Sequence, residues 1–370
     1  MTTTRHSFSK ILLGRPLDTA AAPHQVIGKI PALAVFASDA LSSVAYATEE
    51  ILVILALTGA AYFYLSIPIA VAISVLLVVL TISYRQTIFA YPGGGGAYIV
   101  ARDNLGELPA LTAGAALLTD YILTVAVSIS SGVAQITSAF PALHPYRVDL
   151  AVMMILIMTV INLRGVKESS SAFAMPTYFF LGLAFLLLGA GAFRLVTGTL
   201  GQVTGVEMVT DSLQPLTLFI ILRAFSSGCT ALTGVEAISN GIPAFKEPRS
   251  RNAANTLLAM SGILMTLFIG ITFLARAVDA RPSEAETVIS QIARTVYGDG
   301  LLYLLTLVST TVILIMAANT SFADFPRLAA LQAGDGFLPR QLTFRGSRLV
   351  FSWGIFVLAG IALLLVIAFQ

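Results

Sequence analysis

The chain has 370 residues, of which 57% are hydrophobic and 11% are charged, and its mean hydropathy is +0.88. Soluble globular domains carry about a quarter charged residues, so this composition excludes a soluble chain and indicates one whose surface lies in lipid. The net charge of +2 provides no basic surface for a nucleic acid, and the single cysteine excludes a disulfide framework and a thiolate metal site.

Apolar runs of about 20 residues, enough to cross a hydrocarbon core of about 30 Å, recur along the chain. They predict nine membrane spans, at roughly 31–57, 63–84, 109–140, 148–163, 169–196, 216–243, 253–277, 301–331 and 349–369. Residues 1–30 are polar and lack the features of a signal peptide, so they are predicted to be a tail before a transmembrane domain over 31–370. Lys and Arg are concentrated in alternate loops and in this tail, which predicts that the N-terminus is cytoplasmic.

The last apolar run stops at Gln370 without a polar segment after it. An odd number of spans that ends in this way predicts a truncated chain. We therefore expect further C-terminal helices in the intact protein.

The first span contains a carboxylate well inside an apolar helix. Asp39 lies among small and hydroxyl residues, including Ser42 and Ser43, that can bond to freed backbone groups. This pattern predicts an interrupted helix near residues 38–43 with Asp39 in a functional site. An aspartate at a helix end near the membrane interface is the alternative. Glu49 and Glu50, further along the span, are predicted to be surface or gate residues.

The third span presents a polar stripe. Asp120, Thr124 and Ser128 are spaced i, i+4, i+8, with Tyr121 adjacent, so the three fall on one helical face. This face is predicted to line a cavity. The alternative is that the hydroxyls only hold helices together through hydrogen bonds.

The sixth span is a second candidate for an interrupted helix. Gly228, Gly234 and several hydroxyl residues, among them Thr233, break an apolar run that also contains Glu236. We expect residues near 226–234 to leave helical geometry. Two interrupted spans at matching positions of two halves predict a substrate site at the middle of the membrane, whereas tight small-residue packing is the alternative.

Two further motifs have weaker meaning. The glycine run from Tyr91 to Tyr98 (YPGGGGAY) lacks the lysine and hydroxyl ending of a phosphate-binding loop and any strand before it. It predicts a turn where helices approach closely. The hydroxyls of residues 309–311 in the eighth span either line an ion site or pack within the bundle.

Four segments resemble the amino acid–polyamine–organocation (APC) superfamily, and more narrowly its KimA-type potassium–proton symporters. They are FASDALSSVAYATEEIL (36–52), YPGGGGAYIVARDNLG (91–106), LTDYILTVAVSISSG (118–132) and TALTGVEAISNGIPAFKEP (230–248). The resemblance implies an all-α integral membrane protein with a LeuT-like fold, a 5+5 inverted repeat with broken helices 1 and 6, and a possible homodimer. It also implies a cytoplasmic regulatory domain, which we expect to be missing here. The cation ligands that it implies are Asp39, Tyr46, Asp120, Tyr121, Thr124, Ser128, Thr233 and Glu236.

These features predict a secondary transporter, with proton-coupled potassium uptake by alternating access as the first hypothesis. Carboxylate, hydroxyl and phenol oxygens suit a dehydrated potassium ion, and Asp39 or Glu236 is expected to carry the proton. An amino-acid or organic-cation permease is the alternative. No metalloprotease, serine-hydrolase or histidine-cluster motif occurs in the spans, so we expect neither an enzyme nor a cofactor.

Overall fold

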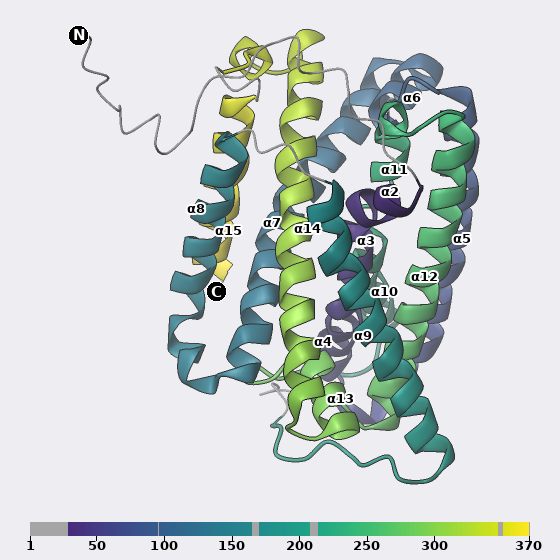
Figure 1. Ribbon diagram of the computed structural model, residues 1–370, viewed down its shortest axis with the longest axis vertical. Helices are drawn as coiled ribbons and strands as arrows, with labels where there is room; N and C mark the ends of the chain where they lie inside the picture. Colours follow the sequence, from purple (N-terminus) through teal and green to yellow (C-terminus); the bar gives the residue numbers. More distant parts are fainter. Residues whose placement is uncertain (1–28, 95, 165–169, 208–213, 347–350, 370) are drawn as a thin grey trace, which may run out of the picture.

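The computed structural model describes residues 29–94, 96–164, 170–207, 214–346 and 351–369, and every secondary-structure element in these ranges is a helix. The long helices form one elongated bundle and run roughly along its length (Figure 1). The predicted cytoplasmic tail lies outside the described residues, except for Lys29 and Ile30, and so does Gly95 of the glycine run.

Eight helical segments are long and apolar enough to cross a membrane, and they match the predicted spans from the second to the ninth. They comprise α5 (Ser66–Ala90), α7 (Glu107–Ala139), α8 (Arg147–Leu163), α9 (Ser170–Val196), α10 with α11 (Leu218–Gly228 and Ala237–Asn240), α12 (Arg249–Ala277), α14 (Leu301–Gly334) and α15 (Ser352–Phe369). The chain is therefore a multi-pass membrane protein.

The first predicted span is divided into short pieces, none of which could cross a membrane alone. They are α2 (Lys29–Phe36), α3 (Ser38–Ser42), the 3₁₀ helix η2 (Ser43–Ala45) and α4 (Ala47–Ala56). The remaining short elements are η3 (Ala60–Leu65), α6 (Gly96–Leu105), η4 (Pro141–Tyr146), η5 (Cys229–Leu232), η6 (Ile242–Ala244), α13 (Val288–Tyr297) and η7 (Arg340–Thr343).

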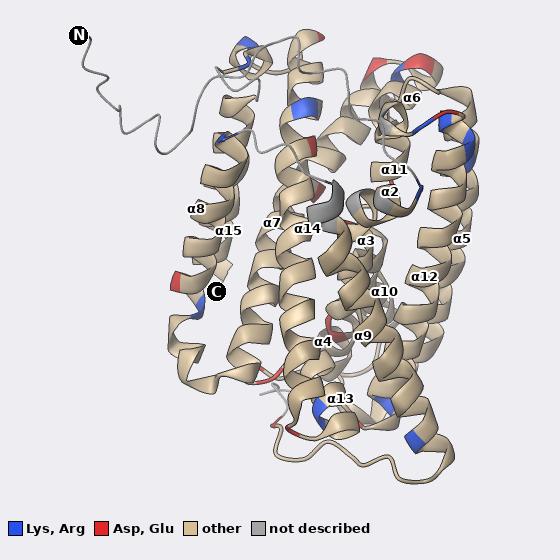
Figure 2. Cartoon of the chain, in the orientation of Figure 1, with Lys and Arg blue, Asp and Glu red and all other residues tan. Residues whose placement is uncertain are grey.

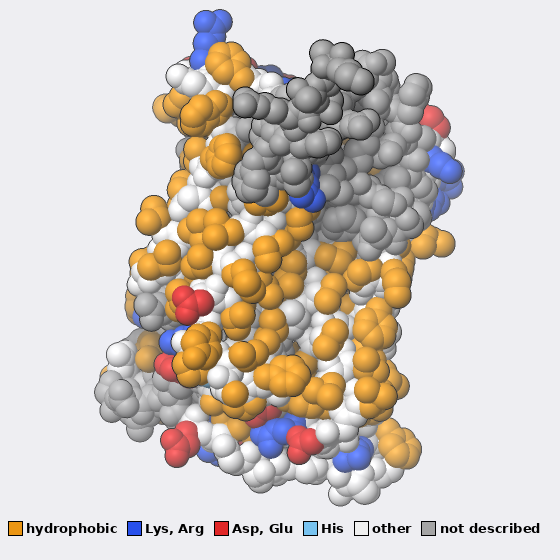
Figure 3. Space-filling view, turned by 60° about the vertical axis from the view of Figure 1, so that its left-hand side comes forward, with side chains coloured by type: hydrophobic (Ala, Val, Ile, Leu, Met, Phe, Trp, Pro, Cys, Tyr) orange, Lys and Arg blue, Asp and Glu red, His pale blue; other side chains and the backbone are white. Residues whose placement is uncertain are grey.

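The outer surface of the bundle is apolar. Large hydrophobic side chains such as Val75, Phe273 and Leu364 are exposed. Hydrophobic side chains also cover much of the face of the molecule that Figure 3 shows. Lys, Arg, Asp and Glu lie mainly at the two ends of the bundle (Figure 2). This distribution suits lipid around the middle and water at both ends, because a helix satisfies its own backbone hydrogen bonds in hydrocarbon.

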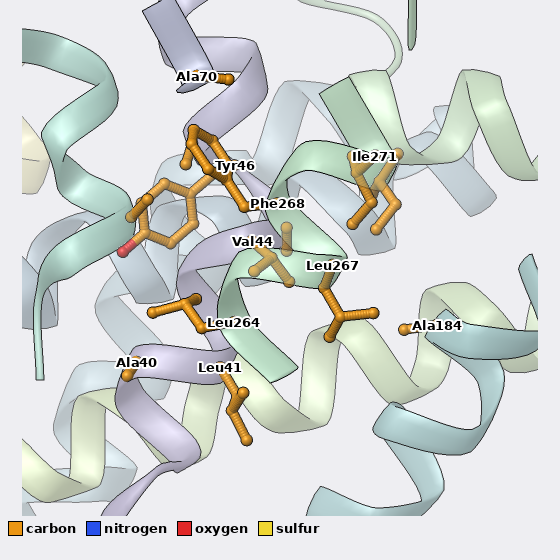
Figure 4. Packing of buried hydrophobic residues seen from close by; sticks show 14 of the residues in the cluster. Ala40, Leu41, Val44, Tyr46, Ala70, Ala184, Leu264, Leu267, Phe268 and Ile271 are labelled. Atoms are coloured by element: carbon orange, nitrogen blue, oxygen red, sulfur yellow. The ribbon is translucent and has the colours of Figure 1, made fainter. Parts of the chain in front are cut away.

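The interrupted first span packs its apolar side against α12. Leu41 and Val44 lie beside Leu264 and Leu267 of α12, as Figure 4 shows. The ring of Tyr46 joins this group, but its hydroxyl oxygen points away from the apolar side chains (Figure 4). The polar groups of the break therefore face the other side of the span, toward the interior of the bundle.

The other side of the interior is bounded by α7 and α14, which pack closely along each other. At Gly132 a methyl group would lie in ordinary van der Waals contact, 3.7 Å from the carbonyl oxygen of Thr311 in α14. The two helices are thus packed against each other, and we call this pair the α7–α14 wall.

At one end of the bundle, hydrogen bonds join α6 to the end of α14. The Tyr98 hydroxyl donates to Oδ2 of Asp335 at 2.7 Å, and Nη1 of Arg102 donates to the same oxygen at 2.8 Å. Burial, together with the hydrogen bond to Asp335, raises the pKa of Tyr98 to about 12, so the phenol stays protonated and remains a donor at neutral pH. These bonds join α6 to the end of α14.

The glycine run at the start of α6 contacts the end of α11. Gly94 has φ +78°, and a Cβ atom there would lie 2.9 Å from the carbonyl oxygen of Asn240. Gly96, with φ +53°, lies against the side chain of the same asparagine. The predicted turn at a close helix approach is confirmed, and the partner is the end of the sixth span.

We predict that Gly94→Ala destabilises the protein by about 1–3 kcal/mol, because an alanine at this φ is strained and its methyl group meets Asn240. Gly93→Ala is the matched control, since Gly93 has open space within 4 Å and no positive φ. Thermal unfolding of the detergent-solubilised protein measures both. Equal melting temperatures for the two variants would contradict the close approach.

Candidate functional site

Both predicted interruptions are present, although neither matches its predicted window in full. In the first span, residues 38–42 are helical, and the chain departs from α-helix at Ala37 and again over Ser43–Tyr46. In the sixth span, α10 continues to Gly228, and η5 and a turn over residues 233–236 follow. The predicted window of 226–234 is confirmed for residues 229–234, whereas the window of 38–43 was wrong for residues 38–42, because a short helix re-forms between the two breaks of the first span.

The two interruptions touch each other. Gly234 has φ +76°, and a Cβ atom there would lie 2.8 Å from Cβ and Cγ of Asp39 and 2.9 Å from the backbone nitrogen of Ala40. A hydrogen bond of 2.9 Å joins the hydroxyls of Ser43 and Thr233, and one of 3.0 Å joins those of Ser43 and Tyr46. Glycine is required at this point because its missing side chain lets the sixth span reach Asp39.

Asp39 is buried, with 3% of its surface exposed. Its Oδ2 accepts a long hydrogen bond of 3.4 Å from Thr320 in α14, whereas its Oδ1 has no hydrogen-bond partner among the described residues. The hydroxyls of Ser42 and Ser43 donate to the backbone oxygen of Asp39 at 2.7 and 3.3 Å. These bonds fix the backbone beside the break and leave the carboxylate with spare acceptor capacity.

Glu236 is the last residue of the second break and the N-cap residue of α11. It is 6% exposed, and its Oε1 has no hydrogen-bond partner among the described residues. Asp39 interacts electrostatically with Glu236 and with Asp120 of α7. The three predicted intramembrane carboxylates therefore come from three different spans and surround one region of the interior.

The polar stripe on α7 faces the same region. Tyr121, Thr124 and Ser128 are buried, Asp120 is half-buried, and the Ser128 hydroxyl has no hydrogen-bond partner in the described part of the chain. Asp120 interacts electrostatically with Glu236 and Tyr46. The structure thus brings the predicted site residues of the first, third and sixth spans together.

Sequence reasoning missed the contribution of α14. Thr320 donates to Asp39, and Asp324, one helical turn further on, interacts electrostatically with Asp39 and Glu236. Asp324 also pairs at 3.6 Å with Arg327, which is 71% exposed in its side chain. Asp324 lies inside the predicted eighth span (301–331), so the rule that flags intramembrane carboxylates applied to it as it did to Asp39.

The hydroxyls of residues 309–311 in α14, the other candidate ion ligands, are hydrogen-bonded to backbone oxygens. The hydroxyls of Ser309 and Thr310 both donate to the backbone oxygen of Thr306, at 2.9 and 2.7 Å. Thr311 donates to the backbone oxygen of Gly132 at 3.5 Å. These contacts support the packing interpretation of residues 309–311.

The arrangement is rich in oxygen acceptors and poor in positive charge. Besides Asp39, Glu236 and Ser128, the hydroxyls of Thr230 and Ser321 have no hydrogen-bond partner among the described residues. No three His, Cys, Asp or Glu side chains of the described residues are grouped as ligands of one metal ion. The carboxylates of Asp39, Asp120, Glu236 and Asp324 face this region from four different spans.

Comparison of the sequence with known proteins identifies a family and two relatives. A family model described as "Amino acid permease" matches residues 27–370. Potassium transporter KimA of Bacillus subtilis is 52% identical over 364 residues, which cover 98% of this chain and 60% of KimA. The low-affinity putrescine importer PlaP of Escherichia coli K12 is 21% identical over 287 residues, which cover 74% of this chain and 61% of PlaP. The chain thus spans about three fifths of the length of these curated relatives.

We predict that Gly234→Ala separates the two interruptions, because the added methyl group would overlap Asp39 and the φ of +76° is strained for alanine. Asp39 should then react several-fold faster with a hydrophobic carbodiimide, as measured by mass spectrometry of the peptide that contains it. Gly262→Ala in α12 is the control, since its Cβ would meet nothing within 4 Å. Unchanged labelling of Asp39 in Gly234→Ala would show that the contact does not shield the carboxylate.

Proposed function

The chain belongs to the amino acid permease family, and we propose that it is a secondary active transporter that takes up potassium together with protons by alternating access. The observation that supports this most is the buried Asp39 at the contact of the two interrupted spans, with a carboxylate oxygen that has no partner among the described residues. The 52% identity to a potassium transporter supports the same substrate.

A potassium ion that has lost its water needs several oxygen ligands without a soft donor. We assign this role to Asp39, Tyr46, Thr233 and Asp120, with Tyr121, Thr124 and Ser128 on the α7 side. The carboxylates contribute charge, whereas the hydroxyls and the phenol contribute neutral oxygens that can be replaced by water as the ion leaves. Thr320 and Asp324 of α14 belong to the same region and are added to the predicted set.

The proposed proton coupling is based on the close spacing of several carboxylates within the membrane. Asp39, Glu236, Asp120 and Asp324 all interact electrostatically in a region of low dielectric constant. Ionised carboxylates in such a cluster repel one another, so a bound proton or a bound cation relieves the repulsion. Glu236 and Asp39 are the proposed proton carriers, because both are buried and each has an unpartnered oxygen among the described residues.

An organic-cation or amino-acid permease is the second candidate, favoured by the 21% identity to a putrescine importer. Asp39 disfavours an amino acid, because two like charges about 4 Å apart repel by roughly 4 kcal/mol at an effective dielectric constant of about 20. That repulsion acts against the α-carboxylate of an amino acid, whereas a polyamine carries no such group. No enzymatic role and no cofactor are proposed.

The membrane orientation and the assembly are part of the same proposal. We propose that the N-terminus and α6 lie on the cytoplasmic side and α13 on the outer side, which the bias of Lys and Arg supports. Interruptions in the first and sixth spans, five spans apart, support an inverted repeat with the site at its centre. A homodimer, which the resemblance implies, is proposed with it.

We predict that the full-length protein restores growth of a potassium-uptake-deficient strain at low potassium, and that Asp39→Asn reduces rubidium uptake to background. The substitution removes the charge with little change in volume.

Thr124→Ala and Ser128→Ala each remove one neutral oxygen, so they should weaken apparent affinity for rubidium by only about fivefold. Putrescine and amino-acid uptake are measured in parallel, and wild-type uptake of rubidium by Asp39→Asn would exclude Asp39 as a ligand.

A second prediction concerns the driving force. A proton gradient, acid outside, should drive accumulation of potassium against its own gradient into proteoliposomes that contain the full-length protein, and a protonophore should abolish this accumulation. Glu236→Gln should lose this sensitivity together with accumulation, because it cannot carry the proton. Uptake that depends on sodium and ignores the protonophore would contradict proton coupling.

A further inference from the structure

A short helix lies across the end of the bundle opposite α6. It is α13, Val288–Tyr297, which lies at the lower end in Figure 1 while α6 lies at the upper end. Its N-terminus is capped by Thr287, whose side chain accepts from the backbone nitrogen of Ser290. One face of α13, including Ile289, Ile292 and Val296, is buried against the bundle.

The start of α13 is bound to the α7–α14 wall. The backbone nitrogen of Thr287 donates to the Ser138 hydroxyl at 3.1 Å, and the Thr287 hydroxyl donates to Oε1 of Gln135 at 3.1 Å, both on α7. The Ser290 hydroxyl lies 3.0 Å from that of Tyr303 on α14. These contacts hold α13 to the wall and not to the interrupted spans.

One contact joins α13 to the first span. The backbone nitrogen of Val288 donates to Oε2 of Glu49 at 3.3 Å. The first N–H groups of a helix have no acceptor within that helix, and a carboxylate is favourable beside them. Glu49 lies in α4, the part of the first span beyond the break, so this bond connects the interrupted span to the wall.

The neighbouring carboxylate makes a different connection. Oε2 of Glu50 accepts from the Ser227 hydroxyl of α10 at 3.0 Å. That bond joins α4 to α10, the corresponding part of the other interrupted span. Glu49 therefore links α4 to the wall, whereas Glu50 links the two interrupted spans to each other.

We propose that Glu49 is a positioning residue that latches α4 to the N-terminus of α13 and so holds the outer side of the transport pathway closed. The inference rests on the proposed alternating access and orientation, but not on which cation is transported. Opening to the outside requires α4 to leave α13, which breaks the bond from Val288 to Glu49. The bond from Ser227 to Glu50 is not broken if α4 and α10 move together.

The test measures accessibility from both sides in a Cys229→Ser background. Val288→Cys is the outer probe, since this side chain is 1% exposed beside the latch and the substitution keeps the backbone N–H. Ser321→Cys is the inner probe, because its buried hydroxyl makes no hydrogen bond to the described residues and the change is nearly isosteric. A membrane-impermeant maleimide is applied to right-side-out and to inside-out vesicles.

Glu49→Ala removes the acceptor and should raise outer labelling about tenfold while it lowers inner labelling. Glu49→Gln keeps an acceptor oxygen and should restore part of the closed state. Glu50→Ala is the matched control and should leave the outer probe unchanged, because it does not touch α13 through its carboxylate.

Three results would overturn the latch. These are unchanged outer labelling in Glu49→Ala, an equal rise in Glu50→Ala, and a rise of labelling on both sides, which indicates general loosening. The labelling is read without any transport assay. If the labelling changes as expected but the protein does not take up rubidium, the latch is supported and the proposed potassium transport is contradicted.

Discussion

The contact between Gly234 and Asp39 decides how the two interrupted spans meet. In hydrocarbon every unsatisfied backbone group costs several kcal/mol, so an interrupted helix survives only where other groups of the protein face it. Here the second break presents a glycine to Asp39 and a threonine hydroxyl to Ser43. Each interruption thereby supplies polar partners for the other, and a side chain at residue 234 would prevent this approach.

Burying carboxylates at that contact has a consequence for function. A single buried charge costs several kcal/mol unless it is paired or neutralised, and four acidic residues from four spans interact here. Arg327 is the basic group that the structure pairs with one of them, Asp324, and it is largely exposed. The site is therefore best satisfied when small cations or protons occupy it, which is the property that a coupled transporter needs.

The two ends of the bundle hold the interrupted spans in different ways. At one end the positive-φ glycines Gly94 and Gly96, at the start of α6, contact Asn240 at the end of α11. At the other end α13 is fixed to α7 and α14 and meets the first span at Glu49. The first arrangement is a close backbone contact that needs glycine. The second is a single hydrogen bond to a carboxylate, the contact that the proposed latch breaks when the outer side opens.

The sequence by itself determined the membrane class, the positions of the spans and the identity of the interrupted ones. Hydropathy fixes the spans because lipid selects apolar runs of a set length, and an aspartate or a glycine inside such a run is conspicuous. Only the tertiary structure decided which residues converge. It added Thr320 and Asp324, assigned residues 309–311 to packing, and separated the partners of Glu49 and Glu50. These outcomes depend on the rotation of each helix about its axis and on its neighbours, which one chain's periodicity does not specify.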